Sequence, residues 1–278
     1  MSNNIFFERG QMADKPNNYL WNGDCLELMK DIPDKSMDAI ICDLPYGTTA
    51  CKWDSVIPFE PLWKQYKRII KDNGAIVLFG SQPFTSALIS SNYDLFKYEI
   101  VWDKVHGANF FNLKYQPFKT HENIIVFGKN ITYNPIREPR TKSSLKRYNK
   151  GIKKKTPKGN PEHYGVEIDN NYELKDDKHP SSIIKISSKS EKRNGIKHPT
   201  KKPLELIKYL VKTYTNENDW VLDNTCGSNT TGIACYDLNR NYIGIEKDVD
   251  IYNVAKKRME KNILLRANEQ QTLFKDES

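Results

Sequence analysis

Short apolar runs recur along most of the chain. Each contains four or five residues, and they cover residues 19–22, 39–42, 75–79, 98–102, 123–127, 220–223 and 242–246. Strands that are buried on both faces of a parallel sheet read as continuous apolar runs. Each run is therefore predicted to be a strand, which gives seven strands in all.

Between these runs, apolar residues recur every three or four positions. Such segments cover residues 58–71, 83–91, 204–211, 231–238 and 248–268, with a shorter piece at 26–30. This spacing matches the 3.6-residue turn of an α-helix. Strands that alternate with helices in this order predict an α/β fold with a mostly parallel sheet.

The pattern fails in the middle of the chain. Residues 130–195 are rich in Lys, Asn, Ser and Pro and include the basic run Lys153–Lys155, although residues 183–186 could form one strand. A long stretch without periodicity inside an α/β chain indicates an insertion, and a solvated linker is the alternative. We expect three parts: residues 1–129, an insertion at 130–195, and residues 196–278.

Length and charge narrow the range of partners. A chain of 278 residues can bury one sizeable core, and its 43 basic and 35 acidic residues give a net charge of +8. This excess favours a polyanionic partner, although charge alone does not identify nucleic acid.

The cysteines and histidines do not form a metal-binding motif. No CxxC or HExxH spacing occurs, so reduced thiols in a cytoplasmic protein without a metal site are expected. We also expect no membrane segment and no signal peptide, because no apolar run approaches the roughly 20 residues of a spanning helix. The five cysteines are Cys25, Cys42, Cys51, Cys226 and Cys235.

The first candidate site follows the run at 39–42. There the chain continues as Asp43, Leu44, Pro45 and Tyr46. Parallel strands present functional groups at their carboxyl ends, and this one presents a hydrogen-bond acceptor, a restrained backbone and an aromatic ring. These groups suit a planar ring that carries an exocyclic amine.

The second candidate site follows the run at 220–223. A loop of small residues leads from Asp223 to Thr230, a helix follows, and the next strand ends in Glu246. Backbone amides at such a turn can approach a ligand closely, and the acid is placed to accept from ribose hydroxyls. The loop lacks a P-loop Lys-Ser/Thr pair and departs from GxGxxG. A tight structural turn and a helix-capping acid are the alternatives.

Together these stretches resemble the DNA amino-methyltransferases. The resemblance rests on residues 43–46 and 223–232, with further similarity at 23–25 and in the HPTKKP segment at 198–203. The order, with the catalytic motif before the cofactor motif, is similar to the beta group of this family. It implies a Rossmann-like methyltransferase fold with circularly permuted motifs and a seven-stranded, mostly parallel sheet, in which residues 130–195 form the target-recognition region.

The resemblance also implies a mechanism. S-adenosylmethionine would donate the methyl group, and double-stranded DNA would be the substrate, with the target base flipped out of the duplex. Asp43 and the carbonyl of Leu44 would accept the two amine hydrogens, Pro45 would restrain the turn, and Tyr46 would stack on the base. The implied cofactor residues are Asp24, Cys25, His198, Thr200, Lys202, Asp223, Thr225, Cys226, Gly227, Ser228, Asn229, Thr230 and Glu246. The family also implies a homodimer.

Two positions depart from the family pattern. Leu44 replaces a proline, which should be tolerated because only the carbonyl is used and Pro45 still restrains the preceding residue. Asn229 replaces a glycine, and Asn is among the residues best able to adopt a positive φ. An aspartate at position 43 favours adenine-N6 over cytosine-N4 as the target. An RNA or protein-glutamine methyltransferase, and a DNA-binding protein with a degenerate cofactor pocket, are further alternatives.

Overall fold

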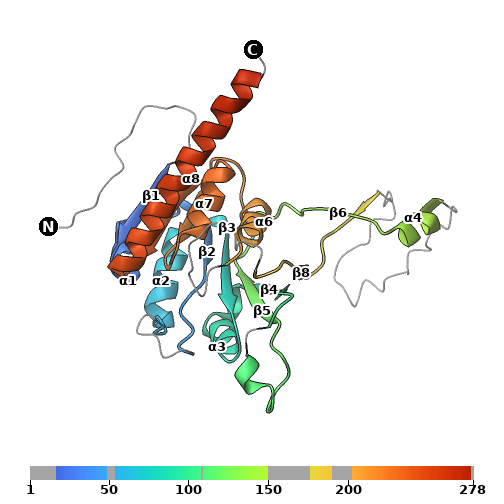
Figure 1. Ribbon diagram of the computed structural model, residues 1–278. Helices are drawn as coiled ribbons and strands as arrows, with labels where there is room; N and C mark the ends of the chain where they lie inside the picture. Colours follow the sequence, from blue (N-terminus) through green and yellow to red (C-terminus); the bar gives the residue numbers. More distant parts are fainter. Residues whose placement is uncertain (1–16, 49–53, 108, 150–175, 190–201, 277–278) are drawn as a thin grey trace. The chain divides into compact units, whose positions relative to one another are not determined.

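The computed structural model describes residues 17–48, 54–107, 109–149, 176–189 and 202–276. By its internal contacts the chain divides into two units, residues 1–134 with 182–278, and residues 135–181. The first unit contains the sheet and all of the helices described below except one (Figure 1). The second unit pairs β6 (Glu138–Pro139) with β7 (Asp177–Lys178) and contains α4 (Lys142–Asn149).

An eight-stranded sheet forms the centre of the first unit. In spatial order its strands are β1 (Asn18–Asn22), β10 (Asn241–Glu246), β9 (Trp220–Asp223), β2 (Met37–Cys42), β3 (Ile70–Gly80), β5 (His121–Phe127), β4 (Phe96–Asp103) and β8 (Ile183–Lys185). Only β5 is antiparallel to its neighbours. The carboxyl ends of all the other strands therefore lie at one edge of the sheet, together with the start of β5.

The prediction of seven strands was one strand short. The eighth is β8, which pairs in parallel with β4. Their register aligns Ile183 with Val101. Its sequence gives little signal, because Ile184 is buried while Ile183 is 58% exposed. A side-chain hydrogen bond from Trp102 Nε1 to the Ile186 carbonyl, at 2.8 Å, extends this attachment. Residues 182–188 thus belong to the main sheet and not to the separate unit.

Helices cover both faces of the sheet because their apolar residues fall on one side. The α1 (Cys25–Leu28), α2 (Phe59–Ile69) and α3 (Phe84–Ser91) helices pack on one face, and α6 (Leu204–Tyr214) and α7 (Thr230–Asp237) on the other. In α2, for example, Leu62, Trp63, Tyr66 and Ile69 are all buried. Three short 3₁₀ turns, η1 (Met29–Asp31), η2 (Tyr93–Leu95) and η3 (Phe110–Asn112), complete the helical segments.

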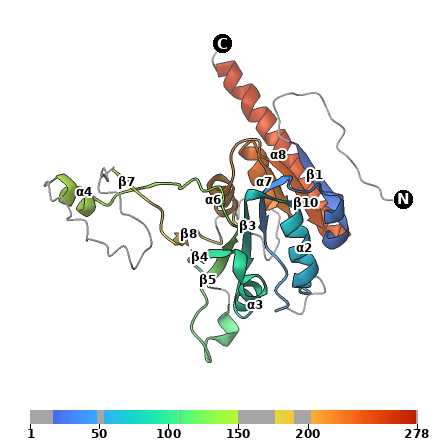
Figure 2. The same cartoon turned by 180° about the vertical axis from the view of Figure 1, so that it is seen from behind.

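The last helix is longer than its apolar pattern predicts. It was expected at residues 248–268, whereas α8 runs over Val249–Asp276. It packs against α7, β1 and β10, which lie beside it when the molecule is seen from behind (Figure 2). No helix within the described segments combines the length and the apolar character that a bilayer crossing requires.

Candidate active site

The sheet topology brings the two sequence motifs together. Asp43 follows β2, Asp223 ends the neighbouring β9, and Glu246 ends β10, the next strand in the sheet. The two motifs are separated by about 180 residues in the chain, yet Thr225 Oγ1 donates a 3.1 Å hydrogen bond to the Asp43 carbonyl oxygen. The amine-acceptor motif and the loop proposed for the cofactor are therefore directly linked.

Both carboxylate oxygens of Asp43 have partners. Oδ1 accepts a hydrogen bond from the Tyr46 hydroxyl at 2.7 Å, and Oδ2 accepts from Lys202 Nζ at 2.5 Å. The Asp43 side chain is 29% exposed, so it can be reached from solvent. Each oxygen therefore accepts one hydrogen bond from the protein and keeps a further lone pair.

The other motif residues frame this carboxylate. The ring of Tyr46 stacks on Phe84, with centroids 5.0 Å apart, and burial together with the Asp43 charge raises the pKa of the phenol. Tyr46 therefore stays a hydrogen-bond donor. The side chain of Leu44 is buried in the core beside α1–α3, and Pro45 is half-buried. A leucine at position 44 thus contributes packing that a shorter side chain would lose.

Lys202 lies with the acceptor motif. It was expected among the cofactor residues, but its ammonium lies between Asp43 and Glu122, 3.3 Å from Glu122 Oε2. Burial alone would lower the pKa of Lys202, but the two carboxylates outweigh it and the pKa is raised. Lys104 binds the other oxygen of Glu122 at 2.9 Å. Glu122 was not predicted as a site residue, because it lies near the start of an ordinary apolar strand.

Asp223 shapes the cofactor loop from inside. Its oxygens accept from Thr231 Oγ1 at 2.7 Å and from the Thr225 amide at 3.2 Å, and burial raises its pKa to about 7. Cys226 is buried, and its amide donates to the Ile245 carbonyl of β10. These contacts fix the loop to both neighbouring strands.

Glu246 and Gly227 form the part of the loop that could receive a nucleoside. Glu246 Oε2 accepts from the Gly227 amide at 2.9 Å, while Oε1 accepts from the Asp248 amide at 2.9 Å. Gly227 has φ of +51°, and no atom lies within 4 Å of where a Cβ would project. The backbone here faces open space beside a carboxylate that retains lone pairs for ribose hydroxyls. These residues fit S-adenosylmethionine.

Asn229 adopts the conformation expected of it. Its φ is +63°, in the left-handed region, directly before α7. Ser228 and Thr230 on either side are held by the buried Arg258 of α8, whose Nη1 donates to the Ser228 carbonyl, Ser228 Oγ and Thr230 Oγ1 at 2.8–3.0 Å. Burial lowers the pKa of Arg258 to about 10. Nothing in the basic sequence of α8 distinguishes this arginine from its solvated neighbours.

The Gly-Asp-Cys motif supports the site from β1. Asp24 caps α1 through the Leu26 amide at 3.0 Å and pairs with Lys247 at 3.0 Å. Cys25 is buried and accepts from Asn224 Nδ2 at 3.5 Å. His198 and Thr200, which were also expected to contact the cofactor, lie outside the described residues.

A buried polar network lies beneath both motifs and was not predicted. Asn224 Oδ1 accepts from the Tyr66 hydroxyl at 2.5 Å and from Cys42 Sγ at 2.8 Å. Burial raises the pKa of Tyr66 and of Cys42, so both remain protonated donors. The network joins the ends of β2 and β9 to α2. The sequence gives little indication of this network, because each segment contributes only a single polar side chain to it.

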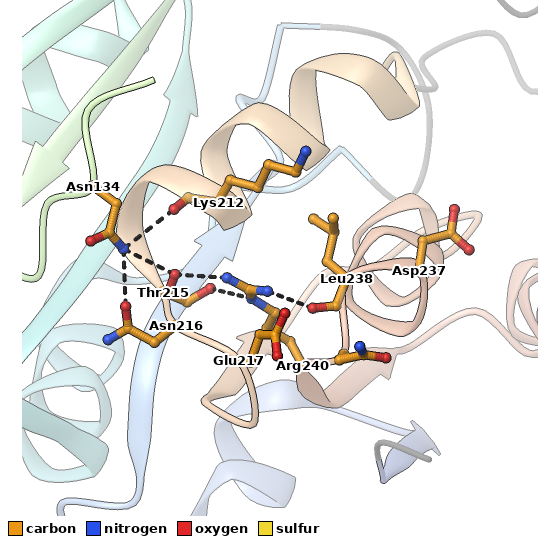
Figure 3. Close-up of a pocket in the computed structure, with 9 residues that line it drawn as sticks. Asn134, Lys212, Thr215, Asn216, Glu217, Asp237, Leu238 and Arg240 are labelled. Carbon is orange, nitrogen blue, oxygen red and sulfur yellow. Dashed lines mark hydrogen bonds between the residues drawn. The ribbon is translucent and has the colours of Figure 1, made fainter. Parts of the chain in front are cut away.

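A hollow of 510 Å³ lies at the opposite edge of the sheet, before the starts of β9 and β10. Its polar groups already bind one another: Arg240 donates to the Thr215 and Leu238 carbonyls, and Asn134 to Lys212, Thr215 and Asn216 (Figure 3). These contacts hold the end of α6 to the residue before β10. Among the described residues no cluster of His, Cys, Asp and Glu is suited to a metal ion.

Comparison with known proteins identifies the family of the chain. Residues 37–257 match the family described as DNA methylase. The chain is 28% identical over 274 residues to the Type II methyltransferase M2.MboI of Moraxella bovis. The alignment covers 88% of this chain and 89% of that relative. It is 27% identical over 292 residues to the Type II methyltransferase M2.DpnII of Streptococcus pneumoniae. That alignment covers 94% of this chain and 98% of the relative.

Solved structures of similar fold include methyltransferases. The M1.HpyAVI complex with S-adenosylmethionine has a TM-score of 0.59 and 25% identity, and covers 87% of this chain and 98% of that one. The cytosine-N4-specific PvuII enzyme has a TM-score of 0.60 at 16% identity, which reports on the fold alone. The expected Rossmann-like methyltransferase fold and cofactor are confirmed. This chain belongs to the DNA methylase family and is an S-adenosylmethionine-dependent DNA methyltransferase.

Proposed function

We propose that this enzyme methylates the exocyclic N6 amine of adenine at specific sites in double-stranded DNA, with Asp43 as the residue that binds the amine. The observation that carries the proposal is the hydrogen bond between Thr225 and the Asp43 carbonyl, because it couples an amine acceptor to the cofactor loop. The similarity to enzymes named Type II methyltransferases supports site-specific modification of DNA.

The amine must be activated because its lone pair is delocalised into the base. Hydrogen bonds from the amine to the Asp43 carboxylate and the Leu44 carbonyl favour a tetrahedral nitrogen and free that lone pair. Bound S-adenosylmethionine supplies a methyl group on a positively charged sulfur, so the N–C bond forms as the C–S bond breaks and a neutral thioether leaves. The surplus amine proton passes by way of Asp43 to water. Tyr46 holds the flipped base by stacking.

Glu246 and the backbone of Gly227 are proposed to hold the ribose end of the cofactor, with the Gly227 amide orienting the Glu246 carboxylate. Asp223, Thr225, Cys226, Ser228, Asn229 and Thr230 shape the loop, and Asp24 and Cys25 support it from β1. His198 and Thr200 are proposed to complete the cofactor site. Residues 1–129 and 196–278 would be the two catalytic halves, and residues 130–195 the target-recognition region. We further propose a homodimer in the cytoplasm.

Label transfer tests the proposed reaction directly. Unmethylated genomic DNA and methyl-labelled S-adenosylmethionine should yield labelled N6-methyladenine at one mapped sequence. Label in N4-methylcytosine would select the cytosine alternative. No transfer, with no detectable cofactor binding at millimolar concentration, would leave a DNA-binding protein with a degenerate pocket.

The loop between β4 and β5 is a proposed DNA contact. It leaves the same edge of the sheet as Asp43 and exposes Phe110, Phe111 and Tyr115, at 64%, 99% and 87%. Stacking of an aromatic ring on a base contributes about 1–3 kcal/mol. Phe111→Ser should therefore lower kcat/KM for DNA by about tenfold or more.

Tyr93 provides a matched control for this loop. It is 74% exposed but lies just before the start of β4, at the opposite edge of the sheet. Tyr93→Ser should leave kcat/KM unchanged in the same assay. Equal losses in the two variants would show that the β4–β5 loop has no particular role in binding DNA.

A further inference from the structure

The Lys202 ammonium contacts the carboxylate that is proposed to bind the target amine. Its nitrogen lies 2.5 Å from Asp43 Oδ2, within hydrogen-bond distance of the proposed amine acceptor. The same nitrogen lies 6.0 Å from the ring centroid of Tyr46 and 4.9 Å from that of Phe79. An amine that binds Asp43 from a base stacked on Tyr46 would overlap this ammonium.

We propose that Lys202 is a place-holder for the target amine: it neutralises Asp43 in the free enzyme and transfers to Glu122 when the flipped base enters. The proposal rests on the proposed function, which assigns amine binding to Asp43. Lys202 would thus be a positioning residue that exchanges one carboxylate partner for another. It would take no part in the transfer of the methyl group.

A partly buried carboxylate is stabilised by such a partner. Removing part of the water around an ionised group without supplying a counter-charge costs free energy, and the site must keep Asp43 ionised until a base arrives. An ammonium and an aromatic amine both donate hydrogen bonds through nitrogen, so either can satisfy Oδ2. The difference is that lysine carries its nitrogen on a flexible four-carbon stem and can withdraw it.

Glu122 is the receiving group. Its side chain is 16% exposed, and Lys104 binds Oε1 at 2.9 Å. Oε2 has no hydrogen bond, although Lys202 Nζ is only 3.3 Å away. A displacement of a few tenths of an ångström would complete that bond, and rotation of the lysine stem that carries Nζ about 1 Å farther from Oδ2 would release Asp43. Burial would raise the pKa of Glu122, but Lys202 and Lys104 lower it, so Glu122 remains an anion.

Two substitutions around Glu122 should act in opposite directions. Glu122→Gln removes the receiving charge, so Lys202 stays on Asp43 and kcat/KM for DNA should fall by about tenfold or more. Lys104→Met removes the competing cation from Glu122, which should draw Lys202 away from Asp43 and favour base entry. We expect kcat/KM for DNA to rise in this variant, with the affinity for S-adenosylmethionine unchanged in both.

Base entry can be followed independently of turnover. A duplex containing the mapped site, with 2-aminopurine beside the target adenine, reports loss of stacking when that adenine flips. Its fluorescence on binding should be lower with Glu122→Gln and higher with Lys104→Met than with the wild type. Thermal unfolding of each variant establishes that it is folded.

The sign of the two effects decides the proposal. A fall in both fluorescence and kcat/KM for both folded variants would assign Lys202, Glu122 and Lys104 a purely structural role and overturn the proposal. In a Lys202→Met background both substitutions should lose their influence on base entry, and persistence of the opposing effects there would also overturn it. Absence of methyl transfer by the wild type would instead contradict the proposed function.

Discussion

Replacing Asp43 with asparagine should lower the rate of methyl transfer by about 100- to 1,000-fold, the range observed when one preorganised electrostatic contact is removed from an active site. Asparagine keeps the shape of the side chain and can still accept from Tyr46, but it has no charge with which to draw hydrogen from the amine. Binding of S-adenosylmethionine should change little, because the cofactor loop contacts the Asp43 backbone and not its carboxylate. Single-turnover label transfer and calorimetric titration measure the two quantities.

Asp38 is the matched control at the other end of the same strand. It is buried, and, like those of Asp43, both of its oxygens have partners: Lys71 Nζ at 2.7 Å and the Trp220 amide at 2.9 Å. Asp38→Asn should reduce stability but leave the single-turnover rate of the folded enzyme close to that of the wild type. Near-normal turnover by Asp43→Asn would remove Asp43 from the mechanism.

Replacing Glu246 with alanine should weaken binding of S-adenosylmethionine by about 10- to 100-fold, which corresponds to the roughly 1–3 kcal/mol of a lost buried hydrogen-bond partner. The substitution removes the proposed acceptor for the ribose hydroxyls and also the 2.9 Å contact that orients the Gly227 amide. At saturating cofactor, the transfer rate should recover substantially. Glu217→Ala, an exposed acid at the opposite edge of the sheet, should leave the affinity unchanged.

The pH dependence of cofactor binding gives a second test of Glu246. Burial raises its pKa above the ordinary 4.5. Only the ionised carboxylate accepts fully from hydroxyl groups, so affinity should be complete at neutral pH and should decline as the pH falls through this raised pKa. The decline should be absent in Glu246→Ala. An identical pH profile in both proteins would place the ribose elsewhere.

Much of the sheet could be predicted because buried parallel strands are uniformly apolar. Runs such as 39–42 and 123–127 have all their central residues in the core. The same reasoning gave only a weak indication of β8 at residues 183–186, because only Ile184 and Ile186 of that segment are buried and its neighbours are exposed. An edge strand that buries only alternate residues has about half of the apolar positions that identify a strand buried on both faces.

The site was predictable to the extent that it lies at the ends of strands. Asp43, Asp223 and Glu246 each follow an apolar run, and parallel topology brings such ends to a single edge. The partners of these residues could not be predicted in the same way. Lys202 reaches Asp43 across 159 positions, and Arg258 reaches Ser228 from one turn of a long basic helix. Such contacts depend on the packed structure and leave no local pattern.

The position of β1 has a consequence for synthesis of the protein. Among the described strands, β1 pairs with β10 alone, whose residues are 241–246, and it leads directly into the Gly-Asp-Cys motif. On the ribosome, β1 must therefore wait until residues 241–246 have been made before its backbone can pair. The loop after β9 is also fixed to β10, through the Cys226 amide, so a nascent chain that stops before β10 holds neither a complete cofactor loop nor a finished sheet.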